Sequence, residues 1–229
     1  MNLFTYTIPV DDGAAPNPFG GFCTLTICKP AIRRTAQAGD WIAGFGSRNA
    51  PSGDLSGRLV YAMRVTKVIP MKEYDRLASF LWPSKIPDVT SKDLTRRLGD
   101  CIYDFSTIPP TQRIGVHGPA NVQVDLGGRN AFVSDHFFYF GSRAIVLPDQ
   151  LRPILHETQG HKSLANTPYI RSFLDWIGSL HLEPGQLYGW PDYIVPWSNM
   201  EECACRSKRV EDEKGAEESV QLTDDGGVP

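Results

Sequence analysis

Glycine and proline interrupt this chain so often that few long helices fit between them. The 229 residues include 21 glycines and 18 prolines, spread along the whole sequence. Because both residue types break regular structure, this distribution predicts many short elements joined by turns. The length is still sufficient to bury a substantial core. We therefore expect a globular protein built from small pieces.

Strand patterns dominate the first part of the chain, and helices are placed between and after the strands. Strand patterns, alternating or β-branched, occur in Leu3–Val10, Trp41–Phe45, Arg58–Ile69 and Asn130–Phe140. Helical spacing occurs in Met71–Leu81 and Pro168–Leu180. This order predicts an α+β fold, either a bent mixed sheet or a small β-barrel, with flanking helices.

Charge divides the sequence into a body and a tail. Residues 201–229 hold nine acidic and four basic side chains, a net charge of −5, so the total of −3 leaves +2 for residues 1–200. We predict a single α+β domain over 1–200 and an acidic, disordered tail over 201–229. A mildly positive body is compatible with a phosphate-bearing ligand, but it lacks the dense basic face of a non-specific DNA binder.

The sequence gives expectations for the cellular compartment and for the state of the cysteines. No apolar run approaches the roughly 20 residues of a membrane span, and the N-terminus lacks a signal-peptide pattern, so we expect a cytoplasmic protein without a membrane partner. The odd number of cysteines argues against a disulfide framework; they are Cys23, Cys28, Cys101, Cys203 and Cys205. A zinc site combining them with a histidine has poor spacing, so no metal site is predicted.

The stretch from Val10 to Ser47 combines acids, thiols and cations with turn residues. Asp11 ends the first predicted strand and could hold a base edge, a sugar hydroxyl or a metal, or could cap its own turn. Asn17 lies between two prolines, where a fixed amide suits the reading of a base edge, although turn formation explains it equally well.

Cationic and aromatic residues later in this stretch extend the predicted nucleotide site. A short helix is expected over Pro30–Ala38, with an anion site near Lys29 and with Arg33 placed to clamp a phosphate. Phe45 could stack on a base or belong to the core, and Ser47 ends the same strand and could line the cleft. Trp41 is expected in the core.

Three residues are candidates for catalysis. Asp11 or His117 could act as a general base, and Cys23 could act as a nucleophile. The sequence lacks the motifs of zinc deaminases and P-loop proteins and has no convincing dinucleotide-binding fingerprint, so those three classes are disfavoured.

The run DDGAAPNPFGGFCTLTICKPAIRRTAQAGDW, with Phe137–Gly141, Gly160-His161 and Trp176, resembles a family of nucleotide-modification-associated domains of phages and bacteria. The resemblance covers roughly 3–197 and implies a role in making, handling or recognising modified nucleotides. A looser resemblance, carried by Gly39-Asp40-Trp41 and Ser47, is to PUA-like modules such as the EVE and ASCH types. Those modules recognise RNA or modified bases.

The leading hypothesis is therefore a protein that binds a nucleotide or nucleic acid and recognises a modified base, formed around Asp11, Asn17, Lys29, Arg33, Phe45 and Ser47. One alternative is an enzyme that catalyses a step of nucleotide or DNA base hypermodification. A second is an accessory module whose acidic tail docks other DNA-modification proteins. The sequence does not identify a cofactor.

Overall fold

A computed structural model describes residues 1–156 and 160–193. The predicted acidic tail lies outside these residues, so its disorder stays a prediction. The strands are β1 (Leu3–Ile8), β2 (Cys23–Leu25), β3 (Trp41–Gly46), β4 (Arg58–Arg64), β5 (Lys67–Pro70), β6 (Tyr103–Asp104), β7 (Thr111–Gln112), β8 (Asn130–Ser134), β9 (His136–Tyr139), β10 (Ile145–Val146), β11 (His161–Lys162) and β12 (Gln186–Leu187). The α-helices are α1 (Pro30–Thr35), α2 (Met71–Phe80), α3 (Leu94–Arg97), α4 (Val122–Gly127) and α5 (Ile170–Ser179).

Within the described residues, five short 3-10 helices fill several of the connections between these elements. They are η1 (Pro83–Lys85), η2 (Pro119–Asn121), η3 (Gly141–Arg143), η4 (Asp149–Ile154) and η5 (Leu164–Tyr169). The many short elements confirm the expectation from glycine and proline content. None of the helices in the described part of the chain has the length and apolar character needed to cross a membrane.

Most of the strands form two sheets. The larger sheet has the order β11-β1-β3-β4-β9-β12, with β10 also paired to β4, and it mixes parallel pairs (β1 with β3, β9 with β12) with antiparallel ones. The smaller sheet is antiparallel, in the order β2-β8-β5. The predicted α+β class with a mixed sheet is confirmed. The barrel alternative is wrong, because the larger sheet is open: its path of pairings ends at β11 and at β12.

Two predicted strands are each divided between the sheets. The prediction of one strand over Arg58–Ile69 is corrected to β4 in the larger sheet and β5 in the smaller one. Asn130–Phe140 likewise divides into β8 and β9. The change occurs where the Thr66 amide donates to the Val133 carbonyl and where the Ser134 hydroxyl donates to the Arg64 carbonyl, so both strands turn together.

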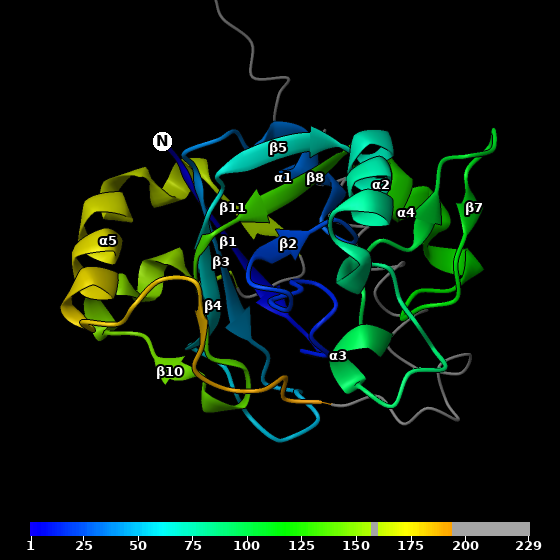
Figure 1. Cartoon of the computed structure of the whole chain (residues 1–229). Helices are drawn as coiled ribbons and strands as arrows, with labels where there is room; N and C mark the ends of the chain where they lie inside the picture. Colours follow the sequence, from blue (N-terminus) through cyan, green and yellow to red (C-terminus); the bar gives the residue numbers. More distant parts are fainter. Residues whose placement is uncertain (157–159, 194–229) are drawn as a thin grey trace, which may run out of the picture.

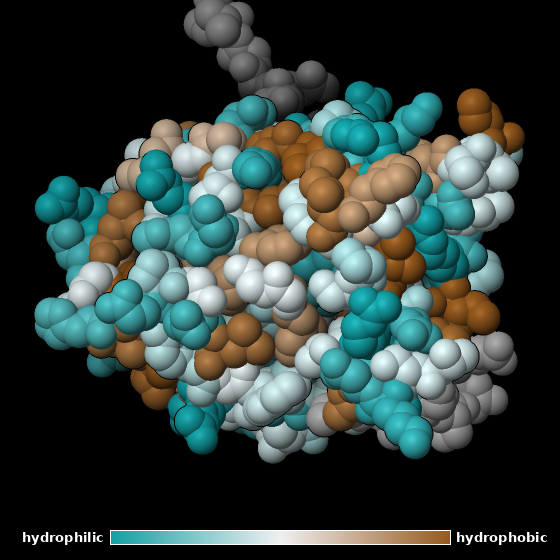
Figure 2. Space-filling view, viewed as in Figure 1, coloured by the Kyte–Doolittle hydropathy of each residue, from teal (hydrophilic) through white to brown (hydrophobic). Residues whose placement is uncertain are grey.

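The two sheets and the helices form stacked layers (Figure 1). One face of the larger sheet packs on α5 through Trp41, Phe45 and Phe173, which places Trp41 in the core as predicted. The other face meets the smaller sheet, whose outer side packs on α2. Figure 2 shows hydrophilic and hydrophobic residues interspersed on the outer surface of this view.

Candidate active site

Cys28 lies in a strained turn between a strand and a helix. It follows β2 and precedes α1, which begins at Pro30, as the sequence predicts. Cys28 and Lys29 have φ angles of 58° and 43°, in the left-handed region that costs about 1–2 kcal/mol per residue without glycine. A nucleophile on a strained strand-to-helix turn is a recurring arrangement in hydrolytic enzymes, because the turn projects its side chain.

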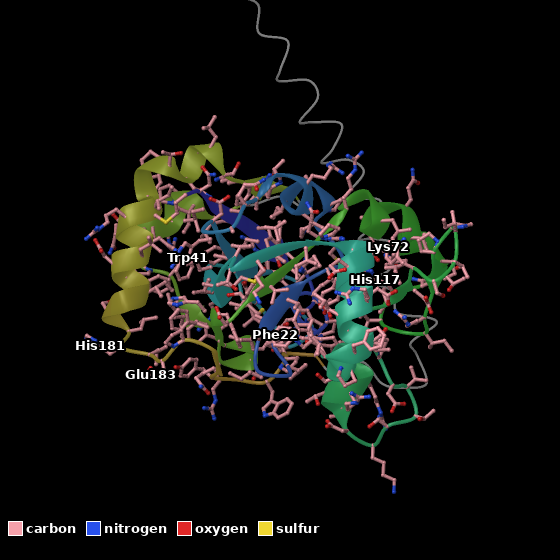
Figure 3. All side chains as sticks on the ribbon, turned by 45° about the horizontal axis from the view of Figure 1, so that its top comes forward. Phe22, Trp41, Lys72, His117, His181 and Glu183 are labelled. Atoms are coloured by element: carbon pink, nitrogen blue, oxygen red, sulfur yellow. The ribbon has the colours of Figure 1, made fainter. Side chains whose placement is uncertain are left out.

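His117 links the Cys28 thiol to the Asp125 carboxylate. The Cys28 Sγ and His117 Nε2 atoms are 3.4 Å apart, and His117 Nδ1 is 2.6 Å from Asp125 Oδ2. The three residues come from the turn before α1, the loop after β7, and α4. In Figure 3, His117 lies on the side of the molecule that carries α2, away from α5.

The three residues differ slightly in burial, and charge and hydrogen bonding shift the pKa values of His117 and Asp125. Asp125 is 0% exposed, His117 4% and Cys28 7%, so Cys28 is the least buried residue of the three. Burial disfavours the imidazolium, but the charges of Asp125 and Cys28 and the hydrogen bonds to them raise the pKa of His117 well above its usual value. Burial also opposes ionisation of Asp125, while His117 and hydrogen bonds to the carboxylate lower the pKa of Asp125.

Neighbouring groups hold both ends of the cluster in place. Asp125 Oδ1 accepts a hydrogen bond of 2.8 Å from the Cys28 amide, and Asp125 Oδ2 accepts one of 2.8 Å from the Tyr103 hydroxyl. The Arg33 guanidinium donates to the Cys28 carbonyl at 3.1 Å and to the Asn130 carbonyl at 2.8 Å. These contacts fix the strained turn and orient the imidazole.

The same three side chains meet a simple distance criterion for a metal site, since one ligand atom of each lies within 4.8 Å of the others. The geometry favours a hydrogen-bonded relay instead. Cys28 and Asp125 contact opposite nitrogens of the His117 ring, so a metal at Nε2 would leave Asp125 as the partner of Nδ1. A metal would then have two protein ligands, the Cys28 thiolate and the His117 imidazole, which is fewer than a zinc site needs.

The other two candidates for catalysis lie elsewhere. Cys23 is fully buried in the core between the sheets, where burial raises the pKa of its thiol to about 12. Asp11 is also buried, and its Oδ1 accepts a 2.6 Å hydrogen bond from the Tyr139 hydroxyl. Burial and the charge of Asp12 raise the pKa of Asp11 to about 7. The structure thus brings His117 together with Cys28 rather than with Cys23.

Asn17 belongs to a buried network rather than to an open loop. Its Oδ1 accepts a hydrogen bond of 2.8 Å from Lys85 Nζ, and its Nδ2 donates to the Leu98 carbonyl at 2.7 Å. Lys85 is fully buried and donates as well to the Phe22 carbonyl and to the Thr24 hydroxyl. These contacts give Asn17 a structural role, and its contact with a base edge stays a prediction.

The cationic and aromatic residues predicted for nucleotide binding do not form one group. Arg33 is fully buried and directed at backbone carbonyls and at the Met71 sulfur. Lys29 Nζ lies 4.9 Å from the centroid of the Tyr6 ring. Phe45 is in the core on the α5 side, and the Ser47 hydroxyl accepts a hydrogen bond from the Asn49 amide. Their nucleotide contacts stay predictions, and Arg33 is better placed to support Cys28.

Asp125 and the role of Cys28 were not predicted from the sequence. Asp125 lies eight residues after His117 in a short helix, without a motif that marks it. The pairing of Cys28 with His117 spans 89 residues and depends on the tertiary fold. The usable signal was local: a cysteine two residues before a proline that begins a helix.

Fold and site together define an α+β protein with two packed sheets and a buried cysteine, histidine and aspartate in mutual contact. The chain belongs to the family described as nucleotide modification associated domain 2, whose model matches residues 1–197. The family predicted from the sequence is thereby confirmed, and it connects the protein to nucleotide modification. No match was found among curated proteins or among solved structures.

Proposed function

We propose that this protein is an enzyme of nucleotide modification that uses Cys28 as a nucleophile in acyl transfer. The observation that carries the proposal is the contact of both His117 nitrogens, one with the Cys28 thiol and the other with the Asp125 carboxylate. A nucleophile, a base and an orienting carboxylate in this order form the arrangement that activates cysteine and serine in acyl-transfer enzymes. The family supplies the nucleotide context.

The proposed reaction begins with proton transfer from the Cys28 thiol to His117 Nε2. The thiolate attacks the carbonyl carbon of an amide or ester on the nucleotide, and an S–C bond forms as the carbonyl electrons move to oxygen. The carbonyl then re-forms, the bond to the leaving amine or alcohol breaks, and His117 protonates the leaving group. Asp125 holds the imidazole in orientation throughout.

Water or an amine completes the cycle. His117 removes a proton from this second nucleophile, which attacks the thioester carbonyl and expels the Cys28 thiolate. The thiolate recovers its proton from His117, so atoms and charges balance over the two steps. The net result is transfer of an acyl group from the nucleotide to water or to the amine.

The test uses a small activated ester as the acyl donor. We expect p-nitrophenyl acetate to acetylate the wild-type protein at Cys28, detected by intact mass and peptide mapping, and Cys28→Ser to remain unlabelled at that position. Cys101→Ser is the matched control, because Cys101 is buried outside the cluster and its loss should leave labelling intact. Hydrolysis of N4-acetyl-deoxycytidine monophosphate tests the nucleotide itself.

Four outcomes would contradict the proposal. One is acetylation of Cys23 with Cys28 unmodified, and a second is equal turnover by wild type and Cys28→Ser. The third is loss of labelling on addition of a chelator with recovery on addition of zinc, which would assign the cluster to a metal. Nucleotide binding without any labelling or turnover would favour a protein that only recognises a modified base.

A further inference from the structure

Three tyrosines form a row across the larger sheet. Tyr6 of β1 is in register with Gly44 of β3, Gly44 with Tyr61 of β4, and Tyr61 with Tyr139 of β9. All three tyrosines belong to the core between the two sheets, so their side chains lie on the same face. The face directed at the smaller sheet therefore carries three buried hydroxyls in line.

Gly44 makes the row possible. A Cβ atom at this position would lie 2.5 Å from Tyr61 Cε1 and 2.5 Å from Ile8 Cδ1. Because Gly44 has no side chain, the Tyr61 ring extends over β3 and its hydroxyl meets that of Tyr6 at 2.9 Å. In a hydrogen bond between two hydroxyls only one of the two protons is donated. One hydroxyl of the Tyr6–Tyr61 pair therefore still has a proton that it can donate to another acceptor.

Asp11 stands at the Tyr139 end of the row with one oxygen unused. Its Oδ1 accepts the Tyr139 hydroxyl, and the backbone amides of Gly13 and Asp192 are near enough to the carboxylate to lower its pKa. Within residues 1–156 and 160–193, no donor makes a well-formed hydrogen bond to the buried Oδ2 atom. A buried acceptor without a partner is destabilising, so such a group calls for an explanation, such as an ordered water, an ion or a bound ligand. Asn166 Oδ1 shares this property, but its amide nitrogen is fixed by three hydrogen bonds.

We propose that Asp11 Oδ2 accepts a hydrogen bond from the exocyclic amino group of a nucleobase. The ligand class is a nucleotide of the cytosine or adenine type, modified or not, in preference to a keto base such as uracil or hypoxanthine. The inference rests on the proposed function for its choice of a nucleotide, but it does not depend on thiol chemistry.

The chemistry of the row favours this ligand over a cation. A carboxylate that accepts from the amino group of cytosine is an established base contact. Among the described residues, Asp11 is the one carboxylate that accepts a hydrogen bond from a tyrosine of the row, and it does so from Tyr139 alone, whereas Ca²⁺ and Mg²⁺ need several oxygen ligands. A keto oxygen opposite Oδ2 would place two acceptors together.

The experiment compares two nucleotide pairs that differ only by an amino or a keto group. Binding of dCMP and dUMP, and of dAMP and dIMP, is measured by calorimetry with the full chain carrying Cys28→Ser, so that no turnover occurs. We expect the amino member of at least one pair to bind about 10-fold more tightly, since Oδ2 can accept from an amino group but not from a keto oxygen.

Two variants assign the preference to Asp11. Asp11→Asn offers an amide that can donate to a keto oxygen, so the preference should disappear or reverse. Tyr139→Phe keeps Oδ2 and should keep the preference. Equal binding within each pair, no binding of any of the four nucleotides, or an unchanged preference in Asp11→Asn would overturn the inference.

The outcomes separate this inference from the proposed function. If Asp11→Asn keeps the preference while Cys28→Ser abolishes acyl transfer, only the assignment to Asp11 fails. If Asp11→Asn loses the preference while Cys28→Ser remains fully active, only the thiol chemistry fails.

Discussion

At the scale of single residues, Asp125 differs from an ordinary buried acid because it serves two partners of the proposed reaction. One oxygen accepts from the Cys28 amide and the other from the His117 imidazole. The strained backbone of the nucleophile and the orientation of its base therefore depend on the same carboxylate. Loss of that charge should affect both stability and thiol reactivity.

Asp125→Asn tests this dual role. Its amide nitrogen would face the N–H group of His117 Nδ1, and removing one member of a buried pair costs about 3–5 kcal/mol. We expect lower stability in urea unfolding and an alkylation rate of Cys28 by iodoacetamide at least 10-fold below wild type, measured by peptide mapping at pH 7.

Tyr103→Phe is the matched control for this substitution. It removes one hydrogen bond to Asp125 but keeps the carboxylate, so the loss should be about 1 kcal/mol, with Cys28 alkylation within about threefold of wild type. Equal effects of the two variants would show that Asp125 acts on stability alone.

At the scale of elements, the sheets are joined by strands that pass from one to the other. β4 continues into β5, and β8 continues into β9, so the pairs β4–β9 and β5–β8 belong to different sheets. The row of tyrosines lies just inside this junction, on the face of the larger sheet that meets the smaller one. Its packing depends on close approach of neighbouring strands.

Gly44→Ala tests that close approach. The added methyl group would meet Tyr61 and Ile8, and overpacking of a core costs about 1–3 kcal/mol. We expect a lower midpoint of urea unfolding. Gly178→Ala in α5 is the control: no atom lies within 4 Å of its added Cβ, so the better helix former should stabilise by up to about 1 kcal/mol. Equal midpoints for the two variants would contradict the packing argument.

Features that depend on residues close together in the sequence were predicted correctly, and features that depend on contacts between distant segments were not. α2 and α5 were readable because their apolar spacing is local, and α1 because Pro30 marks its first turn. The division at Thr66 was not readable, because the Thr66 amide bonds to Val133 in a distant segment. No local pattern in RVTKVI separates a continuous strand from one that changes sheets.

The same reasoning explains the mixed success at the site. His117 was predicted as a candidate base from its glycine-flanked loop and Cys23 as a candidate nucleophile, but a sequence does not show which cysteine lies beside the histidine. Arg33 was predicted to clamp a phosphate from its charge and its place in the expected helix after Lys29, and that contact stays a prediction. Its fully buried guanidinium instead meets carbonyls of Cys28 and Asn130, which come together only in the folded chain.

At the scale of the whole molecule, the core contains ionisable groups whose pKa values burial shifts toward the neutral form. Burial raises the pKa of Asp11 to about 7 and lowers the pKa of Lys85 to about 8. Such groups bind protons differently in the folded and unfolded chains, so the stability of the protein must depend on pH near neutrality.

The Asp11 contribution has a definite sign. Its pKa is about 7 in the folded protein and 3.8 in an ordinary environment, so between these values the folded chain binds more protons than the unfolded chain. Stability from protonated Asp11 is therefore full below pH 3.8 and is lost as the pH rises toward 7. A difference of about three between the pKa values corresponds to about 4 kcal/mol at most.

Asp11→Asn removes this titration. We expect the free energy of unfolding of the variant, relative to wild type, to rise by up to about 4 kcal/mol between pH 4 and pH 8, measured by urea unfolding at several pH values. Tyr139→Phe loses the hydrogen bond that lowers the pKa of Asp11, so its decline in stability should extend to higher pH than in wild type. A constant difference between Asp11→Asn and wild type across this range would mean that Asp11 is ionised in the folded protein. Its unpartnered oxygen would then carry a full buried charge, which a donor from solvent or ligand would have to offset.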